Sequence, residues 1–361
     1  MKPKLYRALG LMSGTSIDGI DAAMIETDGY SHVRPLGFAG RPYDTAFRDN
    51  LRAHLGNANG RQDAGVAAFE RELTVMHAEI ALALMREIAV TPDFIGFHGQ
   101  TLFHNPAERM TVQIGDGALL ATLTGVPTVN DFRSADVRAG GNGAPLVPLY
   151  HRALVTGMAK PALILNIGGV SNVTWIGGDG DDEILAFDVG PGNALLDDWV
   201  LRHTGQPFDE NGLLAAAGTI DSAAVEFAMM REFFTRQPPK SLDRDQFRKY
   251  VPEHLNAADG AATLTMITAR GVAAALPFLP QMPEVIYVAG GGRHNTTLMR
   301  WIADVTALSV RSVDELGWSG DGLEAEAFAY LAVRSVLGEP LSLPLTTGVP
   351  RPMPGGKLHR V

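Results

Sequence analysis

Glycine-rich turns that also carry hydroxyls or a carboxylate are the first places where this sequence could do chemistry. Residues 14–19 read Gly-Thr-Ser-Ile-Asp-Gly. Glycine lets the backbone approach a ligand closely, and exposed N–H groups beside two hydroxyls can surround phosphate oxygens. Asp18 would repel a bare phosphate, which favours a Mg²⁺ ion between them, held through water. A plain hairpin is the alternative, and the chain lacks the GxxxxGK[ST] pattern of a Walker P-loop.

Two turns in the second half of the chain have a similar composition. Residues 166–172 read NIGGVSN, and Gly290-Gly291-Gly292 stands between a predicted strand and a predicted helix. Small-residue hairpins on both sides of a cleft could hold one polyphosphate, and the triple glycine would let a flat nucleoside approach. Tight turns without a ligand are the alternative. The spacing is not GxGxxG, so a Rossmann dinucleotide site fits poorly.

Asp188 is a candidate general base. It follows a predicted strand at 184–187 and precedes Gly190-Pro191-Gly192-Asn193 and a predicted helix. Ligands of open α/β sheets gather at the carboxyl ends of strands, where a carboxylate can take a proton from a sugar hydroxyl or a water. Capping of the helix is the alternative role, although Asn193 could cap it instead and leave Asp188 free.

Another cluster of polar side chains closes the predicted strand at 94–97. His98, Gln100 and Thr101 offer an imidazole, an amide and a hydroxyl, which together suit the hydroxyl groups of a sugar. A lone histidine is more often structural. The ten histidines show no HExxH pattern and no paired spacing, so the sequence does not predict a zinc site.

Two charged side chains could complete a sugar site. Arg133 could hold a substrate carboxylate through two parallel hydrogen bonds, or form an ion pair between domains. Glu324 lies among small residues of a helix predicted at 322–336 and could therefore approach a ligand. A solvated helix face is the alternative reading, and it is favoured for Glu326.

The elements that position these residues repeat in order. Each half of the chain begins with a strand, a small-residue turn and a return strand, at 5–12 and 19–26 and again at 162–167 and 172–176. Helices and strands then alternate, with helices at 66–90, 222–236 and 261–278. The polar stretch 237–250 predicts a surface loop. The repeat predicts two related α/β lobes with a cleft between them.

Composition excludes several classes of protein. The 361 residues are 46% hydrophobic and 19% charged, which favours packed cores over disorder. A net charge of −10 argues against a general nucleic-acid binder, and the lack of cysteine excludes disulfides, iron–sulfur clusters and thiol nucleophiles. The N-terminus lacks the pattern of a signal peptide, and no stretch reaches the roughly 18 apolar residues of a membrane span. We expect a soluble cytoplasmic protein without membrane partners.

Six motifs in order along the chain resemble those of the anhydro-N-acetylmuramic acid kinase family. They are GLMSGTSIDGIDAA at 10–23, FHGQT at 97–101, NDFRSADVRAGGNGAPLVP at 130–148, LNIGGVSN at 165–172, FDVGPGN at 187–193 and VAGGGRHNTTLM at 288–299. The chain departs from the expected pattern at Gly117, where the family has proline, and at Asn142, where it has glutamine. Neither change touches Asp188.

The resemblance implies the two-lobed fold of sugar kinases, actin and the Hsp70 ATPase domain, a duplicated ribonuclease H-like α/β fold with a central cleft. We expect the first lobe to comprise residues 1–130 plus about 337–361, and the second residues 131–336. The resemblance also implies a homodimer, and ATP and Mg²⁺ as cofactors. The implied ATP-binding residues are Gly14, Thr15, Ser16, Ile17, Asp18, Gly19, Ile20, Asp21, Gly168, Gly169, Ser171, Asn172, Gly290, Gly291 and Gly292.

The implied reaction is ring opening coupled to phosphorylation. In the family, water cleaves the 1,6-anhydro ring of 1,6-anhydro-N-acetylmuramic acid and the freed O6 is phosphorylated, giving N-acetylmuramic acid 6-phosphate in peptidoglycan recycling. Asp188 would be the catalytic base, and the implied sugar contacts are His98, Gln100, Thr101, Arg133 and Glu324. A hexosamine kinase of the same fold, or a non-enzymatic ATP-gated binding module, are the alternatives.

Overall fold

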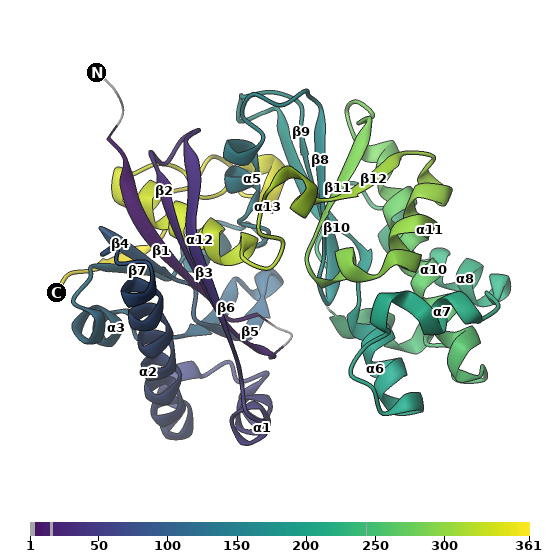
Figure 1. Ribbon diagram of the computed structural model, residues 1–361, viewed down its shortest axis with the longest axis horizontal. Helices are drawn as coiled ribbons and strands as arrows, with labels where there is room; N and C mark the ends of the chain where they lie inside the picture. Colours follow the sequence, from purple (N-terminus) through teal and green to yellow (C-terminus); the bar gives the residue numbers. More distant parts are fainter. Residues whose placement is uncertain (1–3, 15–16, 243) are drawn as a thin grey trace. The chain divides into compact units, whose positions relative to one another are not determined.

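The computed structural model describes residues 4–14, 17–242 and 244–361, which form two compact units (Figure 1). Unit 1 comprises Met1–Thr156 and Gly322–Val361, and unit 2 comprises Gly157–Asp321. The chain therefore crosses between units near 156 and 321, and not near 130 and 336 as the sequence suggested. Segments 131–156 and 322–336 belong to unit 1, because the helix at Leu323–Leu337 (α12) packs on strands of that unit.

Unit 1 is built on a six-stranded sheet. Its strand order is β13-β7-β4-β1-β2-β3. The strands are β1 (Tyr6–Met12), β2 (Gly19–Thr27), β3 (Val33–Pro42), β4 (Phe94–Phe97), β7 (Thr128–Asn130) and β13 (Lys357–His359). Strand β2 is antiparallel to both β1 and β3, whereas β1, β4 and β7 run parallel to one another and β13 is antiparallel to β7. Strands β5 (Gln100–Asn105) and β6 (Met110–Ile114) form a separate hairpin.

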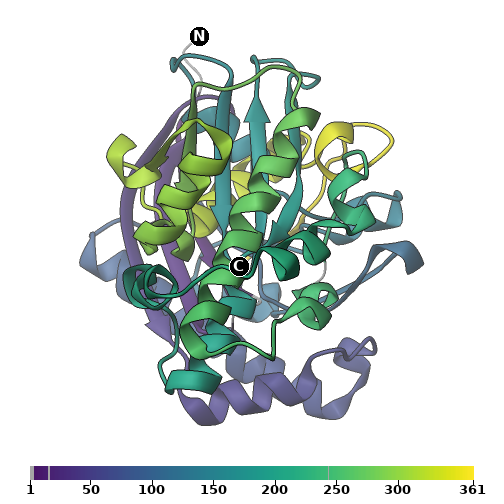
Figure 2. The ribbon, with the colours of Figure 1, turned by 90° about the vertical axis from the view of Figure 1, so that its right-hand side faces the viewer.

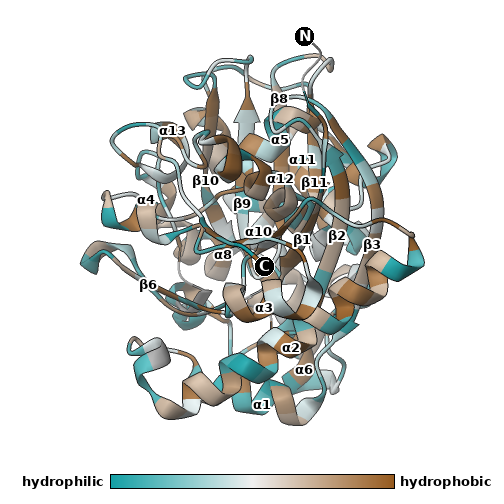
Figure 3. Cartoon of the chain, turned by 90° about the vertical axis from the view of Figure 1, so that its left-hand side faces the viewer, coloured by the Kyte–Doolittle hydropathy of each residue, from teal (hydrophilic) through white to brown (hydrophobic). Residues whose placement is uncertain are grey.

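Helices cover both faces of this sheet. The long helix α2 (Ala64–Glu87) shares a hydrophobic core with Leu9 and Leu11 of β1. Gly10 points to the opposite face, where α12 lies so close that a Cβ on Gly10 would stand 1.7 Å from the Ala325 carbonyl oxygen. Hydrophobic residues line β1 and β2 in Figure 3, as expected for strands covered on both faces. The other helices of unit 1 are α1 (Thr45–His54), α3 (Gly117–Thr124), α4 (Ser134–Arg138), α5 (Pro148–Leu154) and α13 (Pro344–Thr347).

Unit 2 repeats this topology. Its sheet has the order β10-β9-β8-β11-β12, with β8, β9 and β10 antiparallel and β8, β11 and β12 parallel. The strands are β8 (Ala162–Ile167), β9 (Val170–Ile176), β10 (Ile184–Pro191), β11 (Val285–Ala289) and β12 (Ser309–Ser312). The same order and directions relate β3, β2, β1, β4 and β7 in unit 1. This confirms the predicted repeat and the duplicated ribonuclease H-like fold of sugar kinases, actin and Hsp70.

The helices of unit 2 pack mainly around α10 (Ala257–Ala275), which lies in front of the sheet beside α11 (Thr296–Thr306) in Figure 2. The others are α6 (Ala194–Thr204), α7 (Leu213–Ala217), α8 (Ser222–Met229) and α9 (Glu232–Thr235). Among the described residues, one helical stretch, 257–278, is long and apolar enough to cross a membrane, and 67% of its most apolar window is buried. Residues such as Val272 pack it against the sheet, so its hydrophobicity is that of a core helix.

Candidate functional site

The turn between β1 and β2 is braced from the segment that follows β4. The buried Ser13 hydroxyl donates to the Gly99 carbonyl (3.0 Å), and the Gln100 amide donates to the Gly14 carbonyl (3.1 Å). Thr15 and Ser16, two of the predicted phosphate contacts, lie outside the described residues. Asp18 is exposed at the start of the return strand.

The other residues of this turn that were predicted to bind ATP differ in their surroundings. Ile17 and Ile20 are buried in the core of unit 1, so their side chains face away from any ligand at the turn. Asp21 lies on β2, paired with Met12. Among the described residues of this turn, the backbone groups and the carboxylates of Asp18 and Asp21 are the groups whose chemistry suits a ligand.

Gln100 and Thr101 are held inside unit 1. Gln100 is fully buried, and its Oε1 accepts no hydrogen bond from the described residues. Thr101 is half-buried and its hydroxyl accepts a hydrogen bond from Gln113 (3.3 Å). Gln100 therefore supports the Gly14 turn through its amide nitrogen and keeps one buried acceptor unused.

His98 positions Arg133. Its Nδ1 lies 2.7 Å from the Gly99 carbonyl oxygen and therefore carries the proton, so Nε2 accepts the hydrogen bond that Arg133 Nε donates (3.0 Å). Burial and the neighbouring Arg133 cation hold the pKa of His98 well below its usual value, which keeps the ring neutral. Both ring nitrogens of His98 therefore have partners within unit 1, and one of them orients Arg133; a contact of His98 with the sugar stays a prediction.

Arg133 keeps part of its guanidinium for a ligand. Nη1 donates to the Gly143 carbonyl (2.6 Å), while Nη2 makes no hydrogen bond to the described residues. Burial lowers the pKa of Arg133 to about 10, opposed by Glu324 and Asp136, so it remains a cation at neutral pH. All these partners belong to unit 1.

Glu324 and Asp18 complete this charged group. Burial raises the pKa of Glu324, Arg133 lowers it, and Asp18 raises it further. The two carboxylates and the guanidinium therefore act on one another within unit 1, although they are separated by as many as 306 positions in the sequence. A sugar that carries both hydroxyls and a carboxylate would find donors and acceptors together here.

In unit 2, Asp188 lies on β10 in a row of polar side chains. It pairs with Asn172 of β9, which in turn pairs with Asn166 of β8. Directly opposed residues of antiparallel strands share one face of a sheet, so the three side chains lie side by side. Asn172 Oδ1 is buried and accepts no hydrogen bond from the described residues. The predicted base, Asp188, therefore lies beside Asn172, one of the predicted ATP-binding residues.

The Asp188 carboxylate is held at one oxygen. Leu242 N–H donates to Oδ2 (2.7 Å), and no other described residue bonds to the carboxylate. Burial raises the pKa of Asp188 from 3.8 to about 7, and the Leu242 hydrogen bond opposes the rise. A carboxylate with this pKa accepts a proton more readily than an exposed aspartate and is still ionised in a large fraction of molecules at neutral pH.

The turn after β8 is fixed to the segment after Asp188. Gly192 N–H donates to the Gly169 carbonyl (3.1 Å), and Asn193 N–H to the Gly168 carbonyl (2.8 Å). Asn193 stands at the N-terminus of α6 but its side chain bonds to the Ile167 carbonyl (3.3 Å) rather than capping the helix. The buried Ser171 hydroxyl donates to the Pro191 carbonyl (3.3 Å), so this predicted ATP contact faces β10.

The triple glycine follows β11 and is shaped by its neighbours. Gly290 has φ +75°, and a Cβ there would stand 2.5 Å from Asn166 Oδ1. A Cβ on Gly291 would meet nothing nearer than 3.6 Å. Arg293, which the sequence did not single out, donates to the Gly290 carbonyl (3.0 Å) and forms ion pairs with Asp314 and Asp321.

The comparison with known proteins decides the family. The family model described as anhydro-N-acetylmuramic acid kinase matches residues 6–359. The chain belongs to this family. A relative of that name from Rhizorhabdus wittichii is 51% identical, covering 98% of each chain, and one from Rhodospirillum rubrum is 52% identical, covering 97% of this chain and 93% of its own.

Solved structures are similar to this chain at much lower sequence identity. The activator of the 2-hydroxyisocaproyl-CoA dehydratase from Clostridium difficile, with bound ADPNP, has a TM-score of 0.44 at 10% identity, covering 92% of this chain and 96% of its own. A ROK hexokinase from Thermus thermophilus has a TM-score of 0.40 at 18% identity, covering 91% and 99%.

Sequence reasoning about this anhydro-N-acetylmuramic acid kinase family member missed two buried carboxylates. Asp136 accepts hydrogen bonds from Gly143 N–H (2.6 Å), the Thr347 hydroxyl (2.6 Å) and the Ser342 hydroxyl, and so organises the loop that Arg133 also contacts. Glu326, for which a solvated face was favoured, is 2% exposed and accepts a hydrogen bond from Tyr150 (2.6 Å). The small residues at 139–141, which follow Asp136 after two positions, were the feature of the sequence that could have indicated a structural role for this carboxylate.

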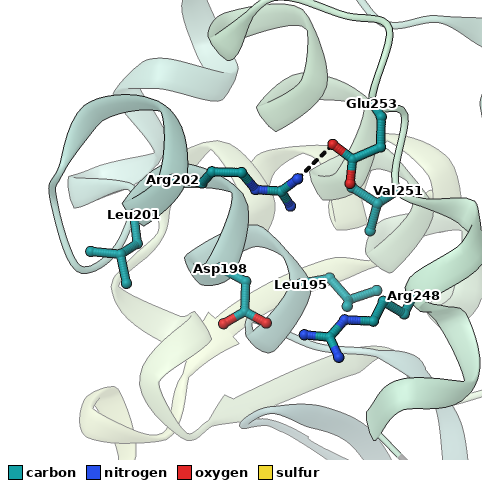
Figure 4. Close-up of a pocket in the computed structure, with 7 residues that line it drawn as sticks. All are labelled: Leu195, Asp198, Leu201, Arg202, Arg248, Val251 and Glu253. Atoms are coloured by element: carbon teal, nitrogen blue, oxygen red, sulfur yellow. Dashed lines mark hydrogen bonds and ion pairs between the residues drawn. The ribbon is translucent and has the colours of Figure 1, made fainter.

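Two surface hollows lie away from the predicted residues. One, of about 450 Å³ in unit 2, is lined by Leu195, Asp198, Leu201, Arg202, Arg248, Val251 and Glu253. Arg202 and Glu253 form an ion pair across it (2.5 Å; Figure 4). The other, of about 470 Å³ in unit 1, is lined by residues of α1, α2 and the end of β3. Neither includes a residue that the sequence assigned to ATP or sugar.

Proposed function

We propose that this protein is an ATP-dependent kinase that hydrolytically opens the 1,6-anhydro ring of 1,6-anhydro-N-acetylmuramic acid and phosphorylates O6. The product is N-acetylmuramic acid 6-phosphate, and the reaction belongs to peptidoglycan recycling. The observation that carries the proposal is Asp188, a half-buried carboxylate with a pKa of about 7 and one oxygen free of hydrogen bonds to described residues. Family membership supports the substrate. A cytoplasmic location, Mg²⁺ dependence and a homodimer belong to the same proposal.

Asp188 would act on water. Its free Oδ1 accepts one proton as the water oxygen bonds to the anomeric carbon and the bond from that carbon to O6 breaks. O6 takes the γ-phosphoryl group and ADP leaves. Of the two hydrogens of the water, one is then on Asp188 and the other is in the new hydroxyl at the anomeric carbon. The hydrogen bond from Leu242 fixes the carboxylate plane, which keeps Oδ1 in one orientation.

The charged group of unit 1 would hold the sugar. N-acetylmuramic acid carries a carboxylate, and Arg133 Nη2 offers donors for it while Nε and Nη1 are occupied by His98 and Gly143. Because Nε donates to His98, the edge of the guanidinium formed by Nε and Nη2 is not available for a two-point contact, and the carboxylate would bind at the Nη2 end. Glu324 would accept hydrogen bonds from sugar hydroxyls.

The glycine turns of unit 2 fit a nucleotide. A Cβ on Gly168 would meet nothing nearer than 3.8 Å and one on Gly169 nothing nearer than 3.5 Å, so internal packing does not explain these glycines. A ligand close to the backbone does. We propose that Gly168, Gly169 and Gly291 approach ATP, which supplies the transferred phosphoryl group.

The donor set fits a Mg²⁺ ion bound mainly by phosphate and water. No group of three or more His, Cys, Asp or Glu side chains gathers at a metal-binding distance within the part of the chain that is described. Asp18, exposed beside the first glycine turn, would contribute the protein's carboxylate. Bound there, the ion would offset negative charge on the transferring group.

Coupled ADP release tests the proposal. Purified protein with Mg-ATP is compared on anhydro-N-acetylmuramate, N-acetylmuramate and N-acetylglucosamine, with Asp188→Asn beside the wild type. We expect turnover with the anhydro sugar and its loss in the variant. A preference for a reducing sugar would indicate a hexosamine kinase instead. ATP hydrolysis that is independent of sugar and unchanged in Asp188→Asn would indicate a binding module.

A further inference from the structure

The polar stretch after α9 runs directly against Asp188. Asp188 N–H donates to the Lys240 carbonyl (3.0 Å), and Leu242 N–H donates to Asp188 Oδ2 (2.7 Å). Residues 240–242, the clamp segment, therefore hold both the main chain and the side chain of Asp188. Because Oδ2 is occupied, the orientation of Oδ1 depends on where this segment lies.

Lys240 anchors the clamp segment. Its side chain is 4% exposed, and Nζ donates to the carbonyls of Phe233 (3.0 Å) and Phe234 (3.5 Å) in α9. Nζ also lies 4.4 Å from the ring centroid of Phe278, 4.9 Å from that of Phe233 and 5.5 Å from that of Phe187. Carbonyl oxygens and aromatic faces both attract a cation. Phe187 directly precedes Asp188, so the ammonium lies beside the strand that carries the carboxylate.

The surroundings of Lys240 are costly for a cation. Burial, and then the charge of Arg236, lower the pKa of Lys240 to about 8, and no described carboxylate pairs with it. No charged side chain contributes to the pKa shift of Asp188, which comes from burial and Leu242. An apolar side chain would fill this space at less cost, but it would make no hydrogen bond to α9. The role of the lysine is therefore to fix the position of the clamp segment relative to α9 through hydrogen bonds, and not only to fill space.

We propose that Lys240 is a positioning residue for the base: its ammonium fixes the clamp segment to α9, so that Leu242 N–H holds Asp188 with Oδ1 directed at the water. The inference rests on the proposed role of Asp188. It also has a consequence for titration, because a hydrogen bond to the ionised carboxylate keeps its pKa from rising further. Loss of the anchor would release that bond and raise the pKa of Asp188.

Kinetics give the first test. In Lys240→Met, we expect kcat to fall about 10- to 100-fold, both KM values to stay within about threefold, and the acidic limb of the kcat–pH profile to move up by about one pH unit. Lys249→Met, an exposed lysine on the same polar stretch, is the matched control and should behave as wild type. An unchanged kcat, or a loss of equal size at every pH, would overturn the proposal.

Carbon-13 NMR of protein labelled at aspartate Cγ gives a test that needs no turnover. The Asp188 signal is assigned by its absence in Asp188→Asn, and its titration midpoint should rise in Lys240→Met. Leu242→Pro removes the donor while leaving the lysine, so the same rise is expected there, and this variant decides the matter if Lys240→Met does not fold. A titration midpoint of Asp188 equal to that of wild type would overturn the proposal that the clamp segment positions this carboxylate. Inactivity of the wild type on the anhydro sugar would overturn the proposed function alone.

Discussion

Replacement of Asp188 by asparagine should abolish catalysis and stabilise unit 2. Burial raises the pKa of the carboxyl from 3.8 to about 7, which means that the folded protein holds the ionised form at a cost. Asparagine has nearly the same shape, and its Oδ1 can still accept the hydrogen bond from Leu242 N–H. The change therefore removes the charge and the proton acceptor while it keeps the packing.

The sign and size of the stability change follow from linkage. Because the folded-state pKa lies above the unfolded one, the folded protein binds the extra proton, and stability falls as pH rises from about 4 to about 7. A rise of about three pKa units corresponds to about 4 kcal/mol above pH 7. Asp188 is half-buried, so screening by solvent reduces this to about 2 kcal/mol. Asp188→Asn should recover that amount at pH 8 and almost none at pH 4.

Tryptophan fluorescence can report unit 2 by itself. The chain has four tryptophans, at positions 175, 199, 301 and 318, and all of them lie within Gly157–Asp321. Urea unfolding of wild type and variant at pH 4.5, 6 and 8 therefore gives the free energy of unfolding of this unit. In parallel, ADP release should fall by at least about 100-fold at every pH.

A stability difference that stays constant between pH 4.5 and pH 8 would refute the reasoning, because the gain must follow ionisation of the carboxyl. A variant less stable than wild type at pH 8 would do so as well. Full loss of activity without any gain in stability would separate the two roles and place the pKa of Asp188 near its ordinary value.

Four further predictions concern single substitutions. His98→Ala should raise KM for the sugar about 10-fold and leave KM for ATP unchanged in initial-rate assays, since it removes a hydrogen bond that orients the Arg133 cation; equal effects on both substrates would count against this role. Ser171→Ala should change KM for ATP by less than about twofold, because its hydroxyl is bonded to Pro191; a large increase would restore it as a nucleotide contact. Gly10→Ala should lower the stability of unit 1 by more than about 3 kcal/mol by thermal unfolding, because its Cβ would overlap the Ala325 carbonyl. Gly168→Ala, which meets no atom within 3.4 Å, should keep the stability and weaken ATP binding instead.

Local sequence patterns predicted the elements that carry the site. The helix expected at 66–90 is α2 at Ala64–Glu87, and the one expected at 322–336 is α12 at Leu323–Leu337. Both have apolar residues at helical spacing, a signal that lies within the segment itself. The strand–turn–strand pattern of each half was equally local, and it indicated the duplicated fold without any knowledge of which strands pair.

Contacts between distant segments could not be predicted in this way. Which unit α12 belongs to depends on Gly10 and Gly96, whose missing side chains make room for the helix on the sheet of unit 1. Polarity suggested a surface loop at 237–250, yet Lys240 is buried there because three aromatic rings and two carbonyls surround its ammonium. His98 has the residue type of a sugar ligand, but its ring nitrogens are both used within unit 1.

The order of the units along the chain bears on how the protein forms during synthesis. Unit 2 is one continuous segment inserted between two parts of unit 1, and α12 follows it. Until the ribosome has passed residue 337, the face of β1 and β4 that carries Gly10 and Gly96 has no helix to cover it. At about 5–20 residues per second, that face waits about 10–30 s while unit 2 is made and can fold. The nascent N-terminal sheet therefore exposes an apolar face during that time, to which a chaperone could bind.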